Sequence, residues 1–184
     1  MDTELIICEK PSQAEKIAQA LGKPQKKTLN KITYYELDFN NKHLIIASAV
    51  GHLYGLDEKE KKGWIYPSFE VVWKPAYEIR KVAAHTKPYL TLLQQLAKKA
   101  TSFVVATDFD IEGETIGLNI VRFACNQQDA KRMKFSTYTK EELLDSYNNA
   151  SKHLEWGQAH AGITRHELDY IYGINLSRAL SLAI

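Results

Sequence analysis

A chain of 184 residues, 45% apolar and 25% charged, has the composition of an ordinary globular protein, with length for one domain of about 140 residues and part of another. Its 24 basic and 22 acidic side chains give a formal net charge of only +2, so net charge does not indicate a nucleic-acid-binding protein and any DNA contact must come from local arrangement. No stretch approaches the roughly 20 apolar residues that span a bilayer and no signal-peptide pattern opens the chain, so we expect a protein that is neither membrane-embedded nor secreted.

Apolar runs predict strands, and the capping-box patterns that begin at Ser12 and Thr139 predict helix starts. In chain order, the expected elements are a strand at 5–8 ending in Glu9, a helix at 12–21, strands at 34–39 and 43–49, a loop-rich stretch at 51–75, a helix at 88–100, a strand at 103–106, a helix at 112–126, a strand at 132–135 and a helix from 139. Strands that alternate with helices predict an α/β fold with a mainly parallel sheet flanked by helices.

From Thr139 onward the pattern predicts only helices. Apolar residues between Leu168 and Ala183 recur with a helical period, and the chain stops at Ile184 without a C-capping signal. We therefore expect residues 1–138 to form the α/β domain and residues 139–184 to begin a neighbouring all-helical domain that is truncated here.

The two cysteines, Cys8 and Cys125, lie far apart in apolar segments and lack the spacing of a zinc site. They predict buried thiols in a reducing cytoplasm.

The strongest chemical signal is the segment Asp108-Phe109-Asp110-Ile111-Glu112-Gly113-Glu114, placed where an apolar strand ends and a helix begins. Ligands of open α/β sheets bind at the carboxyl ends of the strands. Two carboxylates about 4 Å apart repel by roughly 4 kcal/mol at an effective dielectric of 20, so the cluster requires a cation. Mg²⁺ is the expected ion because it takes a few carboxylates and keeps several waters. Glu9 would join Asp108, Asp110 and Glu112 as a fourth carboxylate if its strand is a neighbour.

Two other interpretations of this segment are less favourable. A solvated turn explains four carboxylates beside a glycine poorly. A calcium loop of the EF-hand type would need a bidentate Glu at its twelfth position, which is Asn119 here. The chain has no Gly-x-x-x-x-Gly-Lys-Ser/Thr loop, so ATP-driven chemistry is not supported.

Glu9 after one apolar strand, together with the acidic segment after another, resembles the two signature elements of the Toprim domain. Three more segments resemble type IA DNA topoisomerases in particular, and they occur in the order found in that family: Glu9–Ala14, Ser48–Leu53, and Arg165–Asp169 continuing through Gly173 to Ser177–Leu180. Together they reach from one end of the chain to the other.

The resemblance implies an ATP-independent enzyme that cuts one DNA strand by attack of a tyrosine, passes another strand through the break and reseals it. Asp108 and Asp110 are expected to hold magnesium, with Glu112 helping directly or through water. Glu9 is expected as a further acid at the metal and as the proton donor and acceptor for the leaving 3′ oxygen, or else as a helix cap. Lys10 is expected at the scissile phosphate unless it faces solvent.

Some family members carry a basic residue four positions after the glutamate, where this chain has Gln13, so the role of Lys10 follows the variant with lysine directly after the glutamate. None of the ten tyrosines lies in a segment resembling the family's active-site motif. The nucleophile is therefore expected in a missing downstream domain.

The resemblance also implies DNA contacts by His52 and Arg165, with Asp169 steering Arg165. The alternatives are a histidine bonded to a turn backbone and a simple Arg165–Asp169 pair on one helical face. Gly173, in mid-helix, suggests close approach of another backbone or of nucleic acid.

Two groups of side chains have plainer interpretations. The basic residues Lys131, Arg132 and Lys134 predict a solvated strand edge more than a phosphate-binding patch. The aromatic residues Trp64, Tyr66, Phe69 and Trp73 suit base stacking, but packing of the 51–75 stretch is favoured.

We accordingly expect the chain to bind Mg²⁺ and, weakly, single-stranded DNA, and to be unable to cleave or relax DNA alone. Its partners would be underwound or single-stranded DNA and the other domains of its own chain, in the cytoplasm at the nucleoid. A Toprim nuclease or primase-type fragment is the alternative enzyme and a stand-alone binding module the alternative outside enzymes.

Overall fold

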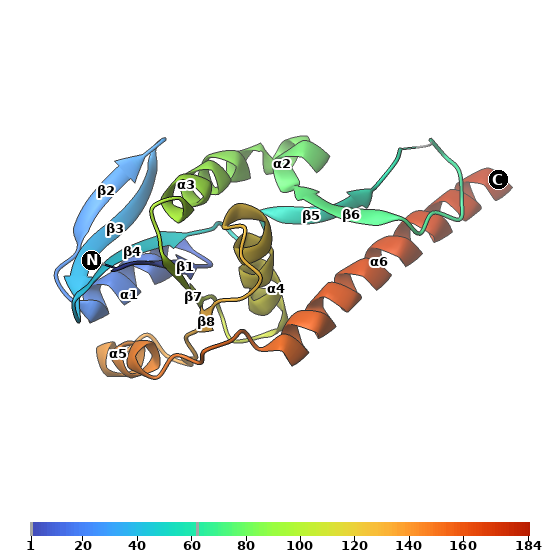
Figure 1. The fold of residues 1–184 in the computed structure, drawn as a ribbon. Helices are drawn as coiled ribbons and strands as arrows, with labels where there is room; N and C mark the ends of the chain where they lie inside the picture. The colour runs from blue at the N-terminus through green and yellow to red at the C-terminus, as the bar shows by residue number, and fades with distance from the viewer. Residues whose placement is uncertain (1, 62) are drawn as a thin grey trace.

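The computed structural model describes residues 2–61 and 63–184. It contains a six-stranded sheet with helices on both faces (Figure 1). Within the sheet, the strands lie in the order β2 (Gln25–Leu29), β3 (Ile32–Phe39), β4 (Lys42–Ser48), β1 (Asp2–Cys8), β7 (Ser102–Ala106) and β8 (Lys131–Arg132). The predicted α/β fold class is confirmed.

The centre of the sheet is parallel. β1 pairs in parallel with β4 on one side and with β7 on the other, and β8 continues in parallel beyond β7, whereas β2 and β3 are antiparallel. The register sets Cys8 opposite Ala106. Because parallel strands end at the same edge, the residues after Cys8 and after Ala106 emerge side by side.

Two apolar cores fill the space between the sheet and its helices. Alternate residues of each central strand face opposite sides, so Ile6 belongs to one core and Leu5 and Ile7 to the other. The first core packs against α1 (Pro11–Leu21) and α5 (Lys140–Asn148). The second packs against α3 (Lys87–Ala97) and α4 (Ile111–Asn119), which a π-helical turn (Ile120–Ala124) extends. Both cysteines are buried, as predicted.

The expected loop-rich stretch at 51–75 begins and ends with strands instead. β5 (Tyr54–Glu58) and β6 (Val71–Pro75) form a separate antiparallel pair, followed by α2 (Ala76–Ile79) and a 3-10 helix (Lys81–Thr86). Long helix α6 (Trp156–Ala183) starts against α4 and runs out beside the loop that joins these strands (Figure 1).

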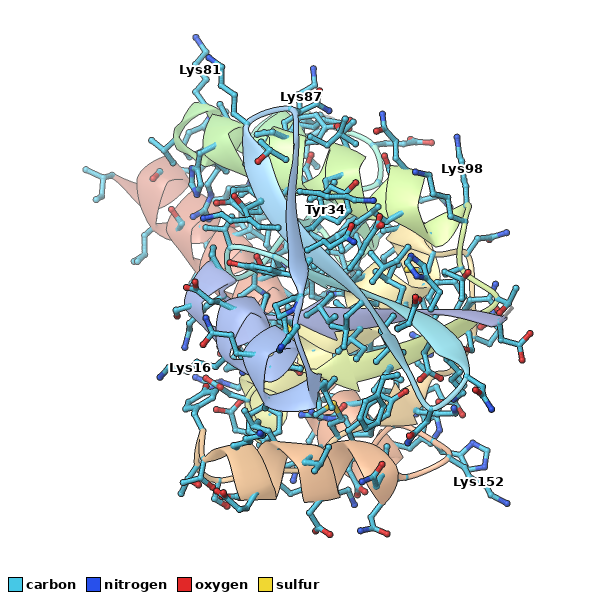
Figure 2. The ribbon with its side chains drawn as sticks, turned by 90° about the vertical axis from the view of Figure 1, so that its left-hand side faces the viewer. Lys16, Tyr34, Lys81, Lys87, Lys98 and Lys152 are labelled. Atoms are coloured by element: carbon cyan, nitrogen blue, oxygen red, sulfur yellow. The ribbon has the colours of Figure 1, made fainter. Side chains whose placement is uncertain are left out.

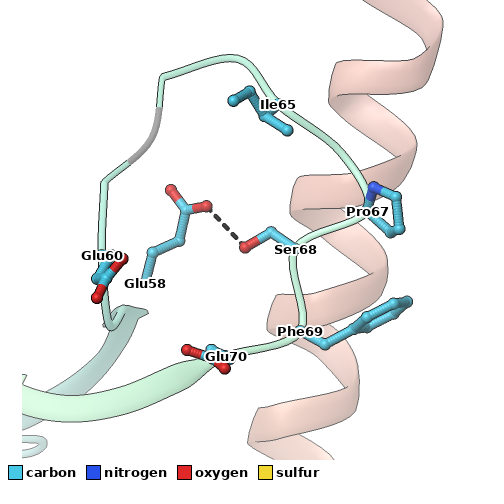
Figure 3. Close-up of a pocket in the computed structure, with 7 residues that line it drawn as sticks. All are labelled: Glu58, Glu60, Ile65, Pro67, Ser68, Phe69 and Glu70. Carbon is cyan, nitrogen blue, oxygen red and sulfur yellow. Dashed lines mark hydrogen bonds between the residues drawn. The ribbon is translucent and has the colours of Figure 1, made fainter.

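Hydrogen bonds fasten the outer half of α6 to the β5–β6 loop. Arg178 forms a bidentate ion pair with Glu58, and both nitrogen–oxygen distances are 2.7 Å. The hydroxyl of Ser68 donates to the same carboxylate from the other side of the loop, at 2.8 Å (Figure 3). The Asn175 amide accepts from the backbone of Ser68 and donates back to it. The loop and the helix therefore hold each other in place.

Two sequence predictions about side-chain environment are wrong. Arg132 does not lie on a solvated edge: it is fully buried, and only its neighbours Lys131 and Lys134 reach solvent. The predicted packing of the aromatic residues in 51–75 is found for Trp73, which lies against the second core. It is wrong for Trp64, Phe69 and Tyr66, whose exposed fractions are 63%, 65% and 47%. The sequence shows residue type, and tertiary neighbours decide burial.

Basic side chains are distributed over the molecule. The labelled lysines in Figure 2, Lys16, Lys81, Lys87, Lys98 and Lys152, point outward from different elements. These lysines therefore do not form one basic patch. Within residues 2–61 and 63–184, no helix combines the length and apolarity that crossing a membrane requires.

Candidate active site

The ends of β1 and β7 bring the acidic residues of two distant segments together. Glu9 follows β1 and Asp108 lies just beyond β7, and the Asp108 backbone N–H donates to Glu9 Oε2 at 3.4 Å. The condition under which Glu9 would join the other acids, that its strand neighbours theirs, is met by the pairing of β1 with β7. Glu9 and Asp108 thus share one corner of the sheet edge.

Lys10 lies between these two carboxylates. Its Nζ is 3.0 Å from Asp108 Oδ2 and 3.4 Å from Glu9 Oε1. The hydrogen bond to Asp108 and the charges of Glu9 and Asp108 raise the pKa of Lys10, so the ammonium stays charged at neutral pH. Two carboxylates that face one cationic nitrogen form a donor set that also fits Mg²⁺, a hard cation that prefers oxygen ligands.

Asp110 has a structural task in the same loop. It is the N-cap of α4, and its Oδ1 accepts from the Gly113 backbone N–H at 2.7 Å. A Cβ at Gly113 would lie 2.0 Å from the Asp108 carbonyl oxygen, so only glycine fits there. Capping occupies one oxygen of Asp110 and leaves the second to be offered to an ion.

A buried ion pair beneath the loop fixes its backbone. Arg132 Nε donates to Glu114 Oε1 at 2.6 Å, and both side chains are 0% exposed. The Arg132 guanidinium also donates to the carbonyls of Thr107 and Asp108, each at 2.8 Å. The charged Arg132 guanidinium thereby fixes the position of the Asp108 backbone. Neither member of this pair was expected from the sequence to act at the site.

Gln13 and Tyr138 also contact Asp108. The Gln13 side-chain amide and the Tyr138 hydroxyl both donate to Asp108 Oδ1, at 3.1 Å each. Gln13 additionally accepts from the Glu9 backbone N–H at 2.7 Å, so one buried amide ties Glu9 to Asp108. The sequence pointed to Gln13 only through its position four residues after Glu9, and nothing in the sequence indicated a role for Tyr138.

Glu112 belongs to a second cluster. Its Oε2 lies 3.0 Å from His52 Nε2 and 3.0 Å from His166 Nε2, while its Oε1 accepts from Arg165 at 3.2 Å. Burial and the charge of His166 lower the pKa of His52, against the opposing effect of Glu112. His52 is therefore bonded to a carboxylate, and not to a turn backbone as the alternative to a DNA contact had it.

The predicted site residues thus fall into two groups. Glu9, Lys10 and Asp108 meet at the strand ends, with Asp110 in the same loop. Within residues 2–61 and 63–184, the one set of three His, Cys, Asp or Glu ligand atoms within 4.8 Å of one another is His52, Glu112 and His166. Arg165 reaches Asp169 at 3.8 Å as well as Glu112, so the pair on one helical face, given above as the alternative to a DNA contact, is present.

Matches with known proteins include the Toprim domain and several DNA topoisomerases. The Toprim domain model matches residues 4–138. DNA topoisomerase 1 of Methanocaldococcus jannaschii is 48% identical over 183 residues, which cover 99% of this chain and 24% of that protein. DNA topoisomerase 1 of Pyrococcus furiosus is 49% identical, with 98% of this chain and 17% of that protein covered. Full-length topoisomerase I from Thermotoga maritima superposes with a TM-score of 0.59 over 91% of this chain and 24% of that one, at 23% identity.

Proposed function

The chain belongs to the Toprim family, and on that premise we propose that it is the metal-binding part of a type IA DNA topoisomerase. It spans about a quarter or less of the length of the relatives described above, which are named DNA topoisomerases. The activity of the whole enzyme, ATP-independent cleavage and religation of one DNA strand, would need a tyrosine from a downstream domain.

One observation carries the proposal. Glu9 and Lys10 meet Asp108 at adjacent strand ends, although Asp108 lies about 100 residues further along the chain. A solvated turn would not need two distant acids around one cation. The convergence matches the chemistry of a phosphodiester, which needs positive charge against the phosphate and a proton carrier beside the leaving oxygen.

Each residue has a role in this proposal. Asp108 and Asp110 would hold Mg²⁺ beside Glu9, with Glu112 helping directly or through water. Bound magnesium would supply neutralisation of the scissile phosphate. Glu9 gives a proton to the leaving 3′ oxygen and takes it back on religation. Lys10, whose ammonium now bridges the two carboxylates, turns toward the phosphate.

The DNA contacts remain proposals of the same kind. Arg165 and His52 both contact Glu112 beside the acidic loop, and both are at least partly exposed. Asp169 would orient Arg165 toward a phosphate of a single strand. The partner is single-stranded or underwound DNA, together with the rest of the enzyme, at the nucleoid of the cytoplasm.

Calorimetric titration with Mg²⁺ tests the proposal. Wild type should bind one ion, and Asp108→Asn/Asp110→Asn should lose roughly tenfold or more in affinity because two ligands lose their charge. The charge-matched control is Glu15→Gln/Glu141→Gln, which alters two exposed acids on other helices and should bind like wild type. Equal affinity in all three proteins would refute the metal centre.

A further inference from the structure

The cluster of His52, Glu112 and His166 has the dimensions of a metal site. Each imidazole Nε2 is 3.0 Å from the same carboxylate oxygen, Glu112 Oε2, and the three ligand atoms lie within 4.8 Å of one another. Around an ion with bonds of about 2.0–2.1 Å, neighbouring ligand atoms are separated by about 2.9–3.4 Å. Both distances to Glu112 already match this spacing, and an ion would draw together the two imidazole nitrogens, which lie within 4.8 Å of each other.

Three separate elements fix these side chains. His52 lies in the turn after β4, Glu112 in the first turn of α4 and His166 in α6. The two imidazole rings pack edge to face with centroids 5.0 Å apart, and the Trp73 ring packs on His166 at 5.8 Å. Arg165 holds the other oxygen of Glu112 at 3.2 Å, which is the outer support that ligating carboxylates commonly have.

The cluster is accessible from outside. His52 and His166 line an open cavity of about 510 Å³, whose wall also includes Asp169 and Tyr170 of α6. The three side chains are each about one third exposed. Water or a phosphate oxygen can therefore approach the ligand atoms, as an incomplete set of three protein ligands requires.

We propose that His52, Glu112 and His166 bind a transition-metal dication, with Zn²⁺ as the expected ion, at a site separate from the carboxylate centre of Glu9, Asp108 and Asp110. Imidazole ligands favour Zn²⁺ and Co²⁺ over Mg²⁺, which prefers oxygen. Binding requires each ring to carry its proton on Nδ1, so that the Nε2 lone pair faces the ion. The inference goes beyond the proposed function and withdraws the Glu112 carboxylate from direct contact with magnesium.

Co²⁺ titration of the tag-free chain, followed by visible absorption, is the test, because imidazole-bound Co²⁺ in a protein site absorbs in the visible. Wild type should take up one equivalent, and Zn²⁺ should displace it. His166→Gln, whose amide can still donate to Glu112, should lose roughly tenfold or more in affinity, as should His52→Ala. Circular dichroism of each variant checks that the fold is intact.

Two controls separate this site from others. His43→Ala removes a different histidine that also lies beside carboxylates, at 2.9 Å from Asp38 and 3.5 Å from Glu36, and should leave the titration unchanged. Asp108→Asn/Asp110→Asn should also leave it unchanged. Absence of stoichiometric binding, undiminished binding by folded His166→Gln, or loss of the signal in the aspartate variant would each overturn the inference. Magnesium calorimetry is read independently, so either site can fail alone.

Discussion

Arg132 is the residue on which the backbone of the acidic loop depends. Removal of one partner from a buried ion pair leaves an uncompensated charge, and here it also leaves the carbonyls of Thr107 and Asp108 without their donor. We predict that Arg132→Met lowers the free energy of unfolding by about 3–5 kcal/mol, measured by urea denaturation. Magnesium affinity should fall with it, because Asp108 loses its support.

Lys134→Met is the matched control for this variant. Lys134 has the same charge two residues away and pairs with Glu155 at a side chain that is 41% exposed. Its replacement should change the free energy of unfolding by no more than about 1 kcal/mol. If Arg132→Met is no more destabilised than Lys134→Met, the buried pair does not support the loop.

At the residue scale, the sequence predicted correctly the positions of side chains that directly follow an apolar strand. Glu9 and Asp108 each follow an apolar strand, and parallel pairing brings such ends together. Arg132 was misjudged because a charged residue in a basic run gives no sign of a buried carboxylate on another element. His166 was missed because its partners, His52 and Glu112, come from remote segments.

At the scale of elements, the contact of α4 with α6 sets the distance between Glu112 and His166. A Cβ at Gly162 of α6 would lie 2.0 Å from Thr115 Oγ1 and 2.8 Å from the Ile111 carbonyl oxygen of α4. We predict that Gly162→Ala forces the helices apart and costs about 1–3 kcal/mol of unfolding free energy. Hydrogen exchange in the first turn of α4 should rise as well.

Gly173→Ala in the same helix provides the comparison. Nothing lies within 4 Å of a Cβ placed there, so the substitution should stabilise the isolated chain by up to about 1 kcal/mol. If nucleic acid approaches Gly173, as its sequence position suggested, the same variant should bind single-stranded DNA more weakly. Equal stability of the Gly162 and Gly173 variants would contradict the close contact of α4 and α6.

Elements with a long apolar pattern were predictable, and short mixed ones were not. β1, β7 and α6 agree with the sequence, since each has a run or period of apolar residues. β5 was missed because Tyr-Gly-Leu-Asp-Glu contains a glycine and two acids, and its Asp57 and Glu58 are buried by pairing with Lys74 and Arg178. Ion pairs with residues outside β5 bury its two acids, and the composition of the strand alone does not predict those pairs.

At the scale of the whole molecule, the chain presents acids, a lysine and neighbouring histidines but contains no tyrosine in the expected motif. Its division at residue 138 into an α/β domain and the start of a helical one stays a prediction. In the structure α5 packs against α1, and α6 packs against α4, so both helices after the boundary contact the α/β part. Under the proposed function, the α/β part supplies one half of an active site.

The most direct measurement joins residues 1–184 to the remaining sequence of one of the topoisomerase relatives described above and tests the fusion for covalent attachment to single-stranded DNA. The wild-type fusion should give a protein–DNA adduct that requires Mg²⁺, the Asp108→Asn/Asp110→Asn fusion should give none, and the isolated chain should neither form an adduct nor nick DNA. An adduct that survives loss of both aspartates, or nicking by the isolated chain, would contradict the account.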